Sequence, residues 1–138
     1  MRVVGLDLGG RRIGVAVSDA SGTVAAPHSV LERGGDTASD HAAIAAVTAE
    51  LEAERVVVGL PISLDGTVGP AASAVLEEIE VLAALLPVPV EAHDERLTTV
   101  TAQRLLTAQK VRARDRRRVV DKVAAAVILQ SWLDASRD

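Results

Sequence analysis

The hydrophobic positions of this chain fall into short runs and helical repeats that predict five strands and four helices. Strands are expected at residues 2–8, 13–18, 23–30, 55–59 and 88–92, and helices at 39–54, 70–86, about 98–109 and 116–135. Short turns between the first three strands predict an antiparallel meander, and Pro27 is typical of an edge strand. The later strands alternate with helices, as in βαβ units. We therefore expect an α/β fold with a mixed five-stranded sheet, antiparallel meander plus parallel strands, and helices on both faces.

An aspartate interrupts the first apolar run, which reads VVGLDLGG. Side chains alternate along a strand, so Asp7 shares a face with Val3 and Gly5. An ionised carboxylate on a covered face is costly unless it is paired or binds a metal. The strand of Asp7 is expected to lie centrally, beside the strand at 55–59, so another part of the chain must supply its partner.

Other carboxylates are expected at the same edge of the sheet as Asp7. The strand at 88–92 continues into His93, Asp94 and Glu95, and parallel strands bring their carboxyl ends to one edge. This spacing leaves Asp94 and Glu95 as alternatives. In the last helix, Asp121 begins an otherwise apolar stripe. Oxygen ligands of this kind suit Mg²⁺ or Mn²⁺, and one or two such ions can serve a phosphodiester displacement.

Each aspartate also has a simpler interpretation when taken alone. Asp7 is compatible with a turn, and Asp121 is compatible with the first turn of a helix, where the helix dipole favours an acid. Together, at the predicted edge of one sheet, the two favour a metal site.

The composition limits the classes of protein to which this chain can belong. A length of 138 residues with 49% hydrophobic residues predicts one domain, residues 1–138, with a core of its own. The chain has no cysteine, which excludes disulfides, thiolate zinc sites and cysteine nucleophiles. Trp132 is its only aromatic residue, so the core must be aliphatic and aromatic platforms for unpaired bases are missing. No apolar run reaches the ~18 residues of a membrane helix, and no signal peptide precedes the first strand, so no membrane partner and a cytoplasmic location are expected.

The net charge is −4, but the basic residues are unevenly distributed. Six of the fifteen lie in one stretch: Lys110, Arg112, Arg114, Arg116, Arg117 and Arg118. Such a stretch is either a solvated surface or a patch that contacts phosphates. Arg11, Arg12, Arg96 and Lys122 flank the predicted acids, where they either contact a nucleic-acid backbone or face solvent.

Three further features have a structural and a functional interpretation. The sequence LPISLDGTVG at 60–69 predicts either a shaped loop at the edge of the acids or a simple connection to the helix that Pro70 opens. His28 and His41 are expected on the surface, and Trp132 in the core. His93 adjoins the acidic edge, where it either assists the acids or has a structural role.

Four segments of the chain resemble the YqgF/RuvX-like family over nearly the whole length and in the same order: GLDLGGRRIGVAVSD, VVVGLPISLDGTVGP, DERLTT and RRRVVDKVAAAVILQSWLD. The resemblance implies an RNase H-like fold and a hydrolase, either a pre-16S rRNA nuclease or a Holliday junction resolvase. It implies that Asp7, Glu95 and Asp121 are the catalytic, metal-binding acids, which selects Glu95 over Asp94. One departure is Ser63, where the family commonly has asparagine.

Three functions are compatible with these features. The favoured one is a metal-dependent nuclease that cleaves structured RNA in the 5′-end maturation of pre-16S rRNA, and so acts in ribosome biogenesis. The second is a resolvase of four-way DNA junctions in recombination and repair, which needs two active sites and therefore a homodimer. The third is a non-catalytic nucleic-acid-binding factor in rRNA processing or transcription. The sequence leaves open whether the protein is a monomer or a homodimer.

Overall fold

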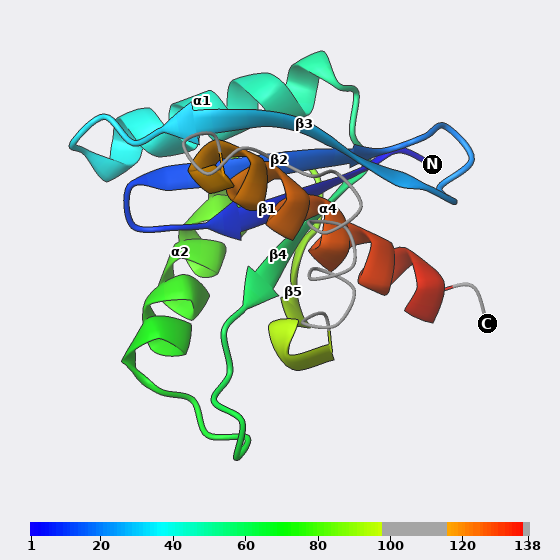
Figure 1. Cartoon of the computed structure of the whole chain (residues 1–138). Coiled ribbons are helices and arrows are strands. Elements are labelled where there is room, and N and C mark those ends of the chain that lie inside the picture. Colours follow the sequence, from blue (N-terminus) through cyan, green and yellow to red (C-terminus); the bar gives the residue numbers. More distant parts are fainter. Residues whose placement is uncertain (98–115, 137–138) are drawn as a thin grey trace.

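A five-stranded sheet lies at the centre of the molecule (Figure 1). The computed structural model describes residues 1–97 and 116–136, and only the backbone of residues 97 and 116–121. The strands are β1 (Val3–Leu8), β2 (Arg12–Ser18), β3 (Ala25–Glu32), β4 (Arg55–Leu60) and β5 (Val90–Asp94), in the order β3-β2-β1-β4-β5. The helices are α1 (Thr37–Glu50), α2 (Pro70–Leu85) and α4 (Arg116–Ala135), and the 3-10 helix η1 (Glu95–Leu97) follows β5.

The pairing of the strands confirms the predicted mixed sheet. β1 and β2 pair antiparallel, as do β2 and β3, whereas β1 pairs parallel with β4 and β4 with β5. β1 is central, and β3 is an edge strand in which Pro27 pairs with Ala16 beside a shift of register. An edge strand tolerates Pro27 because no strand on its outer side needs the N–H donor that proline lacks.

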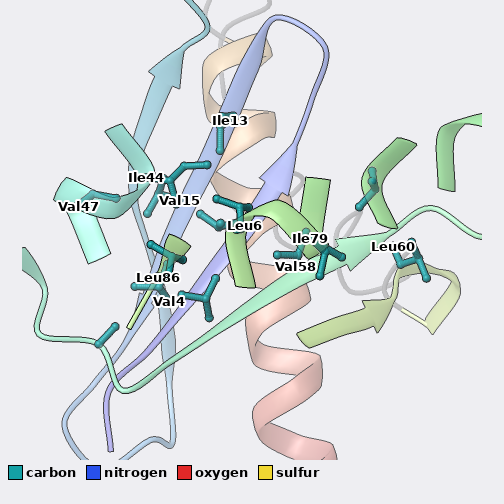
Figure 2. Packing of buried hydrophobic residues seen from close by; sticks show 14 of the residues in the cluster. Val4, Leu6, Ile13, Val15, Ile44, Val47, Val58, Leu60, Ile79 and Leu86 are labelled. Carbon is teal, nitrogen blue, oxygen red and sulfur yellow. The ribbon is translucent and has the colours of Figure 1, made fainter. Parts of the chain in front are cut away.

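Both faces of the sheet are covered by helices (Figure 1). On one face, side chains of β1, β2 and β4 pack against α1 and α2, as Figure 2 shows for Val4, Leu6 and Ile44 among others. On the other face, α4 packs against the remaining side chains of the same strands, including Val3. Because side chains alternate along β1, Asp7 lies on the α4 face, two positions beyond Gly5.

Two strands start two residues later than expected, and hydrogen bonds explain both shifts. The carboxylate of Asp19 accepts the backbone N–H groups of Thr23 and Val24 at 2.8 and 3.1 Å, which keeps these residues in a turn before β3. Before β5, Pro89 has no N–H, and only its carbonyl oxygen joins the sheet, accepting from Val56 at 2.9 Å. The regular pairing of β5 therefore begins at Val90.

Helix α1 is shifted toward the N-terminus relative to the expected range 39–54. It begins at Thr37 because the side chain of Asp36 accepts the N–H of Ser39 at 2.7 Å and caps the helix. It ends at Glu50 because Glu52 has a positive φ of 54°, which is incompatible with a continued helix. The helix expected at about 98–109 lies outside the described residues. None of the helices in the described part of the chain is long and apolar enough to cross a membrane.

Candidate functional site

Asp7 and Glu95 meet at the edge of the sheet where β1, β4 and β5 end. Asp7 is on β1, opposite Gly14 of β2, and Glu95 follows the last residue of β5. β4 lies between these two strands, and its Gly59 makes room for the glutamate side chain. A Cβ on Gly59 would lie 3.0 Å from Cγ and 3.1 Å from Cδ of Glu95. The side chain of Glu95 therefore extends across β4, toward β1.

The charge of Asp7 acts on Glu95. Burial raises the pKa of Glu95 to about 7, and the negative charges of Asp7 and then Asp94 contribute to the same shift. Burial removes water from the carboxylate, and neighbouring acids repel its charge, so both effects favour the protonated form. A pair of this kind is stabilised by a proton or by a bound cation.

Asp94, the alternative that the spacing left open, has a different environment. Its carboxylate accepts two hydrogen bonds from the Arg96 guanidinium, at 2.8 Å from Nε and 2.6 Å from Nη2. These hydrogen bonds, together with the backbone N–H of Arg96, lower the pKa of Asp94. Asp94 is thus held ionised by Arg96, whereas Glu95 lies beside Asp7.

Helix α4 brings Asp121 toward the same edge. The helix runs antiparallel to β1 and β4, as two contacts show. The Trp132 ring lies 5.9 Å from the guanidinium carbon of Arg55 at the start of β4, whereas the earlier residue Ile128 contacts Gly59 near the end of β4. Asp121 precedes Ile128 by about two helical turns, so its backbone lies closer than Ile128 to the carboxyl edge of the sheet. The side chain of Asp121 lies outside the described part of the structure. Among the side chains that are described, no group of three or more His, Asp or Glu forms a metal site.

Gly5 and Gly59 allow this helix to approach the sheet closely. A Cβ on Gly5 would lie 2.7 Å from Cβ of Leu129 and 3.0 Å from the carbonyl oxygen of Ala125. Sequence reasoning did not assign a role to either glycine, although a glycine within a strand is a known sign of close backbone approach.

His93 is also joined to α4. Its Nε2 lies 2.9 Å from the hydroxyl of Ser131, and burial lowers its pKa, with the charges of Asp94 and Glu91 acting in the opposite direction. A neutral imidazole in this position links β5 to α4. Of the two roles that the sequence left open for His93, assisting the acids or a structural one, this contact with Ser131 supports the structural role.

The structure places only part of the predicted basic set. Arg11 is exposed in the turn between β1 and β2, and Arg12 begins β2, so both lie at the carboxyl end of β1. Arg96 lies at the same edge in η1, paired with Asp94. Lys122 is half-buried on α4. Lys110, Arg112 and Arg114 lie outside the described residues, and Arg116, Arg117 and Arg118 are placed in α4 by their backbone alone.

An ionic cluster that the sequence did not reveal lies on the other face of the sheet. Arg33 donates two hydrogen bonds to Glu78, at 2.9 and 3.1 Å, and its Nε donates to the carbonyl oxygen of Gly9 at 2.8 Å. Burial alone would raise the pKa of Glu78, but hydrogen bonds from Arg33 and His41 outweigh it and hold this pKa below its ordinary value. This ionic cluster of Arg33, Asp40, His41 and Glu78 connects the turn between β1 and β2, through Gly9, to α1 and α2.

The expectation that His41 lies on the surface is wrong. Its side chain is 3% exposed, and Nε2 lies 2.9 Å from the Glu78 carboxylate. His41 precedes the buried Ile44 and Thr48 by one and two helical turns, so the helical stripe could have placed it inside. His28 is exposed as expected, and Trp132 of α4 is partly buried against the core cluster between this helix and the sheet.

Comparisons with known proteins agree with this architecture. The family model described as "RuvX: Holliday junction resolvase" matches residues 1–135. A protein of Myxococcus xanthus named "Putative pre-16S rRNA nuclease" is 49% identical over 137 residues, which are 99% of this chain and 90% of that protein. A protein of the same name from Anaeromyxobacter dehalogenans is 49% identical over 134 residues, 97% of each chain.

A solved structure shows the same fold. T. thermophilus RuvC, in complex with a Holliday junction substrate, superposes with a TM-score of 0.54 at 20% identity, over 98% of this chain and 95% of RuvC. This likeness confirms the expected RNase H-like fold. The match of the family model and the identity of the relatives together show that the chain belongs to the RuvX family of nucleases.

Proposed function

We propose that this protein is a divalent-metal-dependent nuclease, acting as one domain in the cytoplasm, that cleaves structured RNA in the 5′-end maturation of pre-16S rRNA. The observation that carries the proposal is the pair of Asp7 and Glu95 at the carboxyl edge of the sheet, where burial and then the charge of Asp7 raise the pKa of Glu95. The names of the two relatives support the choice of RNA.

The donor set fits a hard divalent cation. Asp7 and Glu95 offer carboxylate oxygens, and Asp121 lies near the N-terminal end of α4, the end of the helix closer to the same edge. These three residues would hold one or two Mg²⁺ or Mn²⁺ ions. A bound ion would supply activation of water and stabilisation of the leaving oxygen in phosphodiester cleavage.

The chain's own side chains would bind and orient the substrate. Glu95 must release its proton before its carboxylate can act as a ligand, and its pKa is raised in the metal-free protein, so the affinity for the metal is expected to rise with pH. Arg11, in the turn after β1, and Arg12, the first residue of β2, lie at this edge, where they would contact phosphates flanking the cleaved bond. The basic residues at 110–118 and Lys122 would extend this contact along the RNA.

A second candidate function is the resolution of four-way DNA junctions. It is favoured by the description of the family model and by the fold shared with RuvC, which was solved on a Holliday junction. Two symmetric cuts require two active sites, so this function predicts a homodimer.

One experiment tests both functions. A 5′-extended pre-16S rRNA fragment and a synthetic four-way DNA junction are incubated separately with the protein and Mg²⁺ or Mn²⁺. Wild type is compared with Asp7→Asn and Asp121→Asn, and with Asp134→Asn as a matched control on the exposed end of α4. RNA cleavage that both site variants lose and the control keeps is the expected result. Paired cuts in the junction alone would favour the resolvase, and binding without cleavage of either substrate would favour a non-catalytic factor.

A further inference from the structure

A loop of unusual shape leaves the sheet beside the candidate site. Residues 61–69 connect β4 to α2, and Figure 1 shows them extending beyond the carboxyl ends of the strands. The loop departs after Leu60, which pairs with Asp94, so its origin is the edge that carries Glu95.

Hydrogen bonds within the loop fix its outer turn. The N–H of Gly66 donates to the carbonyl oxygen of Ser63 at 2.8 Å, and the N–H of Ser63 donates to that of Thr67 at 3.1 Å. The carboxylate of Asp65 accepts the backbone N–H and the hydroxyl of Thr67 at 3.0 and 2.7 Å. Gly66 has a φ of +87°, a conformation that favours glycine. The turn is therefore held in one shape by its own residues.

This turn presents a large apolar side chain to solvent. Leu64, in the second position of the turn, is 93% exposed, and Val68 in the same loop is 55% exposed. Leu64 is the most exposed of the large hydrophobic residues in the described chain. A fixed turn that holds an apolar side chain in water is prepared for contact with a second molecule, because little conformational entropy is lost on binding.

The position of the loop beside the candidate site favours a nucleic acid as that molecule. Nη1 of Arg96, a residue whose guanidinium also binds Asp94, lies 3.5 Å from where a Cβ of Gly66 would be, which places the turn next to η1 and Glu95. Gly59, in contact with Glu95, is five residues before Leu64, a reach of at most ~17 Å in an extended chain. A strand of RNA held at Asp7 and Glu95 would therefore bring bases within reach of Leu64, about five nucleotides or fewer from the cleaved bond.

We propose that Leu64 is a wedge, an apolar side chain that packs against a base of the substrate and opens the stacking between neighbouring bases near the cleaved bond. This inference rests on the proposed nuclease function and names a residue that determines which RNA structures fit the site. Proteins insert leucine and other apolar side chains between base steps in this way. The role falls to an aliphatic residue here because the single aromatic residue, Trp132, belongs to α4 and packs against the core cluster.

The test measures base stacking separately from cleavage. 2-Aminopurine, whose fluorescence rises when it leaves the stack, replaces successive purines of the pre-16S rRNA fragment. All proteins carry Asp7→Asn so that the RNA stays intact. To this background are added Leu64→Ser, the conservative Leu64→Met, and Leu85→Ser as a matched control, since Leu85 is 53% exposed at the far end of α2.

The expected result is a fluorescence rise at one or a few neighbouring positions that Leu64→Ser abolishes and that Leu64→Met and Leu85→Ser retain. The Kd for the RNA should rise about fivefold with Leu64→Ser and less than about twofold with the control. A rise that survives Leu64→Ser, or no rise at any position, overturns the proposal. If the wild type cleaves the RNA although Leu64 does not unstack it, only the wedge proposal is refuted. If Leu64 unstacks the RNA but the wild type does not cleave it, the wedge is supported and the proposed nuclease function is refuted.

Discussion

The raised pKa of Glu95 predicts that the metal-free protein loses stability as the pH rises. In the unfolded chain this carboxyl ionises near its ordinary pKa of 4.5, whereas in the folded protein it ionises near 7. Between these values the folded state binds more protons than the unfolded state. The free energy of unfolding therefore falls from about pH 4.5 to about pH 7 and is level above that range.

The size of the effect follows from the same shift. Raising the pKa from 4.5 to about 7 corresponds to at most about 3.5 kcal/mol, at about 1.4 kcal/mol per pH unit. Glu95 is only partly buried, so solvent screens part of this cost, and we expect a loss of about 1–2 kcal/mol.

Urea unfolding at a series of pH values, in a chelator and at low ionic strength, measures this loss. Other groups also titrate, so the informative quantity is the difference between wild type and Glu95→Gln, which cannot ionise. The variant should gain about 1–2 kcal/mol on the wild type between pH 4.5 and 7.5. Asp7→Asn should reduce but not abolish the pH dependence due to Glu95, because burial contributes more than the charge of Asp7.

A metal ion should reverse the effect. Mn²⁺ added at pH 7.5 should restore stability to the wild type but not to Glu95→Gln, because the cation neutralises the carboxylates that repel each other. A free-energy difference between the two proteins that is constant with pH, or that changes in the opposite direction, would refute the placement of Glu95 in a partly buried position beside Asp7.

Two further predictions concern packing and the ionic cluster, both measured by urea unfolding. Gly59→Ala should lower the free energy of unfolding by about 1–3 kcal/mol, since its Cβ would collide with Ile128 and Glu95. Gly10→Ala is the control and should be nearly neutral, because its Cβ would meet open space. Equal losses of stability in the two variants would contradict the close approach of α4 to the sheet. Arg33→Ala should cost about 2–4 kcal/mol by leaving its carboxylate partners without a cation. A cost below about 1 kcal/mol would show that the cluster contributes little.

The sequence was most informative where a local pattern decides the structure. Alternation in residues 3–8 predicts both the central strand and the face on which Asp7 lies, and Pro27 predicts the edge strand. The ends of elements were less predictable, since β5 begins only where the prolines stop and α1 begins where the side chain of Asp36 caps it.

Contacts between distant parts of the chain could not be predicted. The spacing at residues 94 and 95 allowed either acid; the family resemblance implied Glu95, and the packing of Gly59 against Glu95 gives the physical reason that this side chain extends toward β1. The pairing of Arg33 with Glu78 joins residues 45 positions apart, and no local pattern marks it. Leu64 was part of a loop with two interpretations, and its exposure became apparent only with the turn.

The position of α4 has a consequence for synthesis of the protein. α4 is the last described element along the chain, and it covers the sheet face that carries Val3, Ala16, Val57 and Asp7. A ribosome makes all five strands before this helix, so the growing chain displays a bare apolar surface until residues 116–135 emerge. The nascent protein thus passes through a period in which this face of the sheet is open to aggregation, and the docking of α4 ends that period.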